Sequence, residues 1–141
     1  MKKVEISGMR AWCGPTALAA ITGQRYWRMI KVIEDVRGQG NFEGTCNWLE
    51  MLKALERTSV KVEDHRRVDC SLSEFMTKVR PGELFLVRVT GHFMVVEGQK
   101  ICDSYYTRGE VLPFPLLPRG AGGKQLTHWA RLEAQGDSTT I

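Results

Sequence analysis

Several features that would assign a chain to a class of protein at once are missing from these 141 residues. No apolar run approaches the ~18 residues that cross a membrane as a helix. The charges of residues 1–6 are not followed by the apolar stretch of a signal peptide. The sequence therefore predicts a cytoplasmic protein that makes no contact with a membrane. We expect one domain over residues 1–141, in which residues 135–141 form a flexible tail.

Paired cysteines are missing as well. The four cysteines include no C-x-x-C pair, and this spacing argues against a zinc site. Disulfides are typical of secreted proteins, and nothing in the sequence indicates secretion. We therefore expect free thiols, with Cys46, Cys70 and Cys102 as small buried hydrophobic side chains. The sequence predicts neither a metal nor a cofactor.

A cluster of positive charge is also missing. The net charge is +4, from 20 Lys and Arg against 16 Asp and Glu, but there is no run of five basic residues. No motif of stacking aromatic residues accompanies these charges, so a solvated basic surface is expected rather than a nucleic-acid site. Residues 120–124 are rich in glycine, but they follow no strand-to-helix pattern and do not form a phosphate-binding loop. The sequence indicates no oligomeric state.

Helical spacing of apolar residues predicts four helices, over residues 13–22, 25–37, 45–57 and 71–79. The first is apolar on every side and is followed by Gly23, so it should be short and buried. Thr45 is expected to cap the third helix, and Ser71 with Glu74 forms a capping box for the fourth. The side chains predicted to be buried include Trp27, Trp48, Leu49, Leu52 and Leu55.

The predicted strands lie mostly after the helices, at residues 60–62, 84–89, 92–97, 100–104 and 127–132. Residues 64–69 are expected to form a charged loop, and residues 112–123, rich in Pro and Gly, an irregular one. Helices followed by antiparallel strands indicate an α+β fold.

One cysteine occupies a position that favours the reactive, ionised form of its thiol. Cys13 begins the first predicted helix, and the partial positive charge of a helix N-terminus favours the thiolate. His92 begins a strand, and an imidazole beside the thiol would favour the thiolate further and protonate a leaving amine. Asp103 lies on the next strand. A thiol, an imidazole and a carboxylate are the parts of a cysteine-nucleophile site.

The turn between the two strands determines which of these residues are neighbours. A two-residue turn at residues 98–99 places His92 and Asp103 diagonally on one face, with Cβ atoms about 7 Å apart. There the carboxylate would accept the imidazole N–H and fix its tautomer. Cys102 would point to the opposite face. Each of the three residues alone is more often explained by packing or by a turn, and the ordered set favours a functional reading.

Three motifs resemble those of small papain-like cysteine peptidases, at residues 12–20 (WCGPTALAA), 91–96 (GHFMVV) and 101–104 (ICDS). The chain is most similar to the bacteriocin-leader (double-glycine) peptidase domains of ABC exporters and their small bacterial and phage relatives. The likeness covers most of the chain and implies a papain-like fold, in which the nucleophile helix packs against a C-terminal antiparallel sheet. It implies Cys13 as nucleophile, His92 as general base and acid, and Asp103 as the orienting residue. The implied activity is hydrolysis of a peptide or isopeptide bond in a peptide or protein substrate.

One part of the family's site has no counterpart. The family places a glutamine shortly before the cysteine, and its amide helps to hold the oxyanion. This chain has Ser7 there, and neither Gln nor Asn occurs before Cys13. The Cys13 backbone N–H can donate one hydrogen bond, and Ser7, Arg10 or the Trp12 indole are the candidates for the second. The missing glutamine weakens the prediction of efficient peptidase activity.

Two alternatives stay open for this reason. The same site would also suit amide hydrolysis in peptidoglycan or acyl transfer. A catalytically reduced module would instead bind a protein partner, for example as a phage-encoded protein directed at a target in the host cytoplasm. His65, in a charged segment, is expected to be exposed, and His128 is expected at the surface or in the core.

Overall fold

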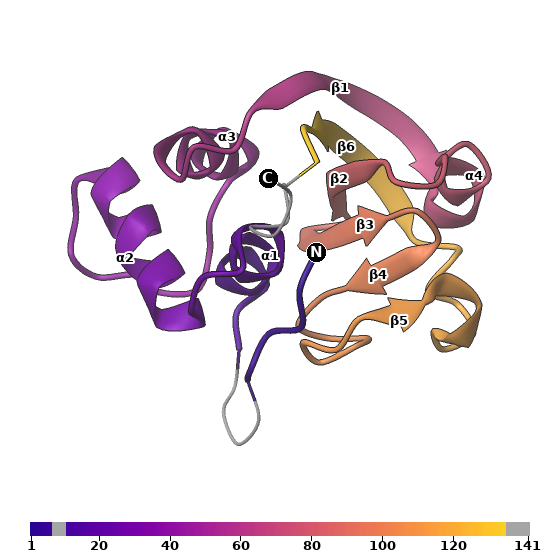
Figure 1. Ribbon diagram of the computed structural model, residues 1–141, viewed down its shortest axis with the longest axis horizontal. Coiled ribbons are helices and arrows are strands. Elements are labelled where there is room, and N and C mark those ends of the chain that lie inside the picture. The colour runs from indigo at the N-terminus through magenta and orange to yellow at the C-terminus, as the bar shows by residue number, and fades with distance from the viewer. Residues whose placement is uncertain (7–10, 135–141) are drawn as a thin grey trace, which may run out of the picture.

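The computed structural model describes residues 1–6 and 11–134. Helices α1 (Cys13–Thr22) and α3 (Trp48–Arg57) lie against one face of a six-stranded antiparallel sheet, and α2 (Tyr26–Arg37) packs on these two helices (Figure 1). The strands are β1 (Val62–Ser71), β2 (Leu84–Val89), β3 (His92–Glu97), β4 (Lys100–Cys102), β5 (Leu112–Pro113) and β6 (Gln125–Leu132). Their order in the sheet is β1-β6-β2-β3-β4-β5. The predicted α+β class is confirmed. No helix in the described ranges is long and apolar enough to cross a membrane.

Each face of the sheet has its own core, because side chains alternate along a strand. On the helical face, Leu86, Val95 and Cys102 pack with the apolar side chains of α1, α2 and α3. On the other face, Val87 and Met94 pack with the short helix α4 (Leu72–Met76). Cys102 therefore points to the face opposite Met94, as the hairpin register predicts.

Helix α1 is buried along residues 14–21, because its small apolar side chains let it lie between α2 and the sheet (Figure 1). It begins at Cys13 and ends at Gly23, whose φ of 73° closes the helix in the left-handed conformation. The Tyr26 hydroxyl accepts a hydrogen bond of 2.9 Å from the backbone N–H of Trp12. This bond ties the entry of α1 to α2 and so fixes the position of Cys13.

The prediction for α3 is wrong at its start. Asn47, and not Thr45, caps the helix, because the Asn47 side chain accepts the Glu50 N–H and the Glu50 side chain accepts the Asn47 N–H, both at 2.8 Å. Leu49 is 58% exposed, and the side chains of α3 that are fully buried are Met51, Ala54 and Leu55. Trp27, also predicted to be buried, is 64% exposed.

The predicted charged loop at residues 64–69 is instead part of β1. This ten-residue strand pairs with β6 at the edge of the sheet, and none of its residues is fully buried. An edge strand can carry charged side chains because they stay in water. Backbone pairing with β6 holds the charged residues of this strand, whereas Val62, Val68 and Cys70 pack partly against the two cores. The charged residues leave no apolar alternation at residues 64–67.

Smaller differences concern the ends of elements. The fourth helix ends at Met76 rather than at residue 79, and β4 ends at Cys102 rather than at residue 104. The predicted irregular stretch at residues 112–123 contains β5 and a 3₁₀ turn, η1 (Phe114–Leu116). The predicted flexible tail at residues 135–141 lies outside the described residues.

Candidate active site

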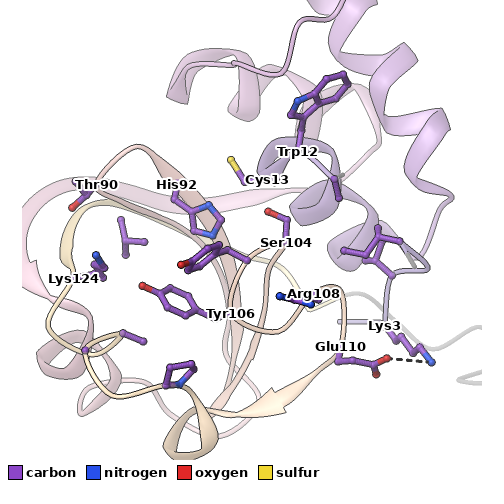
Figure 2. Close-up of a pocket in the computed structure, with 18 of the residues that line it drawn as sticks. Lys3, Trp12, Cys13, Thr90, His92, Ser104, Tyr106, Arg108, Glu110 and Lys124 are labelled. Atoms are coloured by element: carbon purple, nitrogen blue, oxygen red, sulfur yellow. Dashed lines mark ion pairs between the residues drawn. The ribbon is translucent and has the colours of Figure 1, made fainter. Parts of the chain in front are cut away.

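The first turn of α1 borders a cavity of about 1590 Å³. Cys13 and His92 both line it, and the loops at residues 104–110 and 118–124 contribute further lining residues. Figure 2 shows the Cys13 sulfur and the His92 ring together at one wall of this cavity. The two residues come from distant parts of the chain and meet because α1 packs against β3.

A tight turn fixes His92 at the start of β3. Val89 and His92 pair across β2 and β3, and only Thr90 and Gly91 lie between them. Both turn residues have positive φ, 33° for Thr90 and 76° for Gly91. A β-branched residue rarely adopts this conformation, and here a 3.0 Å hydrogen bond from the Thr90 N–H to the Gln125 carbonyl holds it. The imidazole is thus placed by a constrained backbone.

The predicted contact between His92 and Asp103 is confirmed. The His92 Nε2 lies 2.7 Å from Asp103 Oδ2, and the Asp103 side chain is fully buried. Asp103 Oδ1 accepts the Thr107 N–H at 2.7 Å, and Oδ2 accepts the Tyr106 N–H at 3.1 Å. The Thr107 hydroxyl in turn accepts the Asp103 N–H at 2.9 Å. This small loop holds the carboxylate in one orientation toward the imidazole.

The surroundings of Cys13 favour its thiolate. Burial raises the pKa of the thiol, but hydrogen bonds from His92 and the Phe93 N–H, the charge of His92 and the Gly14 N–H together outweigh burial. The pKa of Cys13 therefore lies below its usual value. Gly14 is the second residue of α1, so one of these donors is a free N–H of the helix N-terminus.

The surroundings of His92 favour its imidazolium. Burial lowers the pKa of His92, but hydrogen bonds with Asp103 and Cys13, and the negative charges of both, raise it to about 9. Because Nε2 is bonded to Asp103, Nδ1 is the ring nitrogen that is left for Cys13. The lowered pKa of Cys13 and the raised pKa of His92 both favour a thiolate beside an imidazolium, which is the reactive form of a nucleophilic cysteine.

The two predicted oxyanion candidates differ in what the structure says of them. Ser7, like Arg10, lies outside the described residues. Trp12 lines the cavity, and its ring meets Phe42 edge-on with centroids 5.0 Å apart. In Figure 2 the indole points away from the centre of the cavity. Within the described residues the indole N–H donates no hydrogen bond, unlike the backbone N–H of Trp12. The oxyanion role of Trp12 stays a prediction.

The remaining cysteines and histidines lie apart from this pair. Burial raises the pKa of Cys102 to about 12, and Cys102 is fully buried as predicted, whereas Cys46 and Cys70 are only half-buried. His65 is exposed on β1, as expected, and His128 stacks at a tilt on Trp48, with centroids 5.0 Å apart. In the described part of the chain, no group of three or more His, Cys, Asp or Glu side chains is arranged to hold a metal ion.

Sequence reasoning missed two residues that support the site. Thr107 holds Asp103, and its signal is the spacing of an Asp and a Thr four residues apart in a polar segment, which is typical of side chains that bond to nearby backbone. Tyr26 holds the backbone of Trp12. Its sequence context has only the apolar spacing of an ordinary helix, so no signal marked it.

No protein-family model, curated protein or solved structure matches this chain. The likeness to papain-like peptidases rests on the three sequence motifs. The arrangement of Cys13, His92 and Asp103 rests on the geometry described above.

Proposed function

We propose that this chain is a papain-like thiol hydrolase that cleaves a peptide or isopeptide bond. Cys13 is the nucleophile, His92 the general base and acid, and Asp103 the residue that orients His92. The observation that carries the proposal is the 2.7 Å contact between His92 and a fully buried Asp103, on the wall of an open cavity that Cys13 also lines. A core histidine that served packing alone would need no thiol with a lowered pKa beside it.

The reaction follows from the charges of the pair. The Cys13 thiolate attacks the carbonyl carbon, and the oxyanion forms near the N–H groups at the start of α1. The His92 imidazolium gives its proton to the leaving amine, and a thioester remains on Cys13. Neutral His92 then takes a proton from water, whose hydroxide oxygen displaces the sulfur as a thiolate. The products are a carboxylic acid and an amine, and the pair returns to its starting charges.

Asp103 acts through His92 and does not touch the reacting bond. Its carboxylate keeps Nε2 engaged throughout, so that Nδ1 faces the sulfur in each step. A buried carboxylate beside the ring also stabilises the imidazolium that the first step requires. The loop that bonds Asp103 to Tyr106 and Thr107 supplies the fixed geometry for this task.

The proposal is tested with a peptide library made by digesting a bacterial proteome. New termini are mapped by mass spectrometry after incubation with the protein and with its Cys13→Ala variant. Cleavage that the wild type performs and that Cys13→Ala and His92→Ala both lose supports the proposal. Selective alkylation of Cys13 at about pH 6 without any cleavage would favour an acyl transferase or a peptidoglycan amidase. A Cys13 that reacts no faster than the other three thiols would contradict the hydrolase and favour a binding module.

A further inference from the structure

The cavity carries an excess of positive charge. Four cations line it, Lys3, Arg108, Arg119 and Lys124, against two carboxylates, Glu5 and Glu110. Lys3 lies 3.6 Å from Glu5 and 3.4 Å from Glu110, so both carboxylates lie beside this one cation, and the six groups together leave an excess of two positive charges. Within residues 1–6 and 11–134, the other three cations form no ion pair. Positive charge without a partner inside the protein is available to a ligand.

These cations lie on both sides of the catalytic pair. In Figure 2, Arg108 and Lys124 stand at opposite sides of the cavity, with His92 and Tyr106 between them. Arg119 and Lys124 belong to one compact loop, because two successive turns close it, Ala121 N–H to the Pro118 carbonyl at 3.1 Å and Lys124 N–H to the Ala121 carbonyl at 3.2 Å. An extended ligand that passes Cys13 therefore meets cations on each side.

Arg108 is an unexpected residue at its position. Arg108 and Gly109 have φ values of 49° and 85°, and the Glu110 N–H bonds to the Thr107 carbonyl at 3.0 Å, which closes a tight turn. Such turns favour Asn or Asp before Gly, because these residues tolerate positive φ. Turn formation thus does not explain an arginine here, and its exposed side chain reaches toward the cavity (Figure 2).

We propose that the cavity recognises acidic peptides, with Arg108 binding carboxylates on one side of Cys13 and Arg119 and Lys124 binding them on the other. A guanidinium binds a carboxylate through two parallel hydrogen bonds, and cations at the rim of a site select partners and speed their approach. Cys13 and His92 between the cations act on carbonyl groups, which favours a peptide over a nucleic acid as the ligand. The choice of a peptide as the ligand and the claim that acidic peptides are cleaved both rest on the proposed function, whereas the attraction of the three cations for carboxylates does not.

Binding is measured with the Cys13→Ala protein, so that no cleavage intervenes. The probes are two fluorescein-labelled decapeptides of Ala, Gly and Ser, one with two Glu on each side of a central Ala-Ala and one with Lys at the same four places. Fluorescence anisotropy should show the Glu peptide binding at least about tenfold more tightly, with an affinity that falls as salt rises. Equal affinity, or tighter binding of the Lys peptide, overturns the proposal. Tighter binding of a ten-nucleotide single-stranded DNA than of the Glu peptide also overturns it.

Charge variants separate a local site from the net charge of the protein. In the same Cys13→Ala background, Arg119→Glu with Lys124→Glu should reverse the preference toward the Lys peptide, since the repulsion now acts against Glu. The matched control, Arg28→Glu with Lys53→Glu, changes the charge equally at exposed positions on α2 and α3 that do not line the cavity. A control that weakens binding of the Glu peptide as much as the cavity variant would contradict a local site.

Arg108→Asn tests the remaining cation. Asn is favoured in this turn, so the melting temperature should stay the same or rise while affinity for the Glu peptide falls about threefold to tenfold. An unchanged affinity removes Arg108 from the site and overturns the two-sided recognition. Failure of the proposed hydrolysis and failure of the proposed acidic-peptide recognition give different results. An inert Cys13 leaves the binding measurement unchanged. Cleavage without preference for acidic peptides refutes only the recognition of acidic peptides.

Discussion

The first turn of α1 and the segment that leads into α3 each carry a half-buried thiol, and the two thiols differ in their chemistry. Burial, followed by the charges of Cys13 and Glu50, raises the pKa of Cys46 to about 12. Burial acts in the same direction on Cys13, but His92 and two backbone N–H groups outweigh it and lower the pKa. Partial burial therefore makes a thiol inert unless hydrogen-bond donors surround the sulfur. The two regions differ in these donors and not in how deeply the thiol is buried.

The substitution His92→Ala should remove the difference in pKa between Cys13 and Cys46, and we expect it to have the largest effect on thiol reactivity. Without the imidazolium, burial dominates at Cys13, and each unit of pKa increase lowers the thiolate fraction about tenfold at a given pH. Alkylation of the native protein with iodoacetamide at about pH 6, mapped by mass spectrometry, should label Cys13 selectively in the wild type and not in the variant. Labelling that is equal at all four cysteines of the wild type would contradict the comparison.

Asp103→Asn should leave His92 in place but make its imidazolium a less stable hydrogen-bond donor to Cys13. The pKa of His92, about 9 in the wild type, should fall toward its ordinary value, and the alkaline limb of any cleavage rate should move to lower pH with it. An NMR titration of the His92 ring measures this shift directly. Because the folded pKa is raised, His92 stabilises the fold fully below about pH 6.5, and the contribution is lost as pH rises through about 9. A His92 pKa that Asp103→Asn leaves unchanged would show that Asp103 has no electrostatic role.

Gly14→Ala tests how closely the two regions approach each other. A Cβ at this position would meet the Cys46 sulfur, so the variant should lose about 1–3 kcal/mol of the free energy of unfolding. Urea denaturation measures the loss, and the double variant with Cys46→Ala should recover most of it. If the double variant is no more stable than Gly14→Ala alone, the strain arises elsewhere in α1.

Asn47→Ala should have the smallest effect on stability, and this effect should be confined to the start of α3. The variant removes the capping box of α3, at a cost of about 1 kcal/mol in unfolding free energy. Selective labelling of Cys13 should persist, because no donor to its sulfur comes from the segment before α3. Loss of that selectivity would mean that the cap of α3 also positions Cys13.

Short-range patterns in the sequence were enough to predict the contact between His92 and Asp103 and the helix that begins at Cys13. His92 and Asp103 lie in one hairpin and the loop after it, and the two-residue turn alone sets their register. The helix that begins at Cys13 was also readable from its apolar residues and Gly23. The capping box of α3 was readable too, since Asn47 and Glu50 have the right spacing, but Thr45 is also of a residue type that caps helices.

The rest depends on packing that no local pattern reveals. Cys13 meets His92 only because α1 docks on β3, and the sequence does not state which strand a buried helix covers. Strand β1 was missed because its charged residues are held by backbone pairing with β6 at an edge. The cavity is likewise a product of tertiary structure, since its walls come from loops that are far apart in the chain.

His92 and Asp103 are close in the sequence, whereas Cys13 and His92 are far apart, and this difference predicts the order in which their contacts form during folding. A hairpin and its neighbouring loop form through short-range contacts, whereas docking α1 on β3 closes a long stretch of chain and is expected to come later. During synthesis α1 leaves the ribosome well before β3, so a nascent chain carries Cys13 without His92 beside it. The thiol of such a chain has ordinary reactivity toward oxidants and electrophiles. The lowered pKa of Cys13 is thus a late marker of folding, and an incomplete chain carries this thiol in its ordinary form.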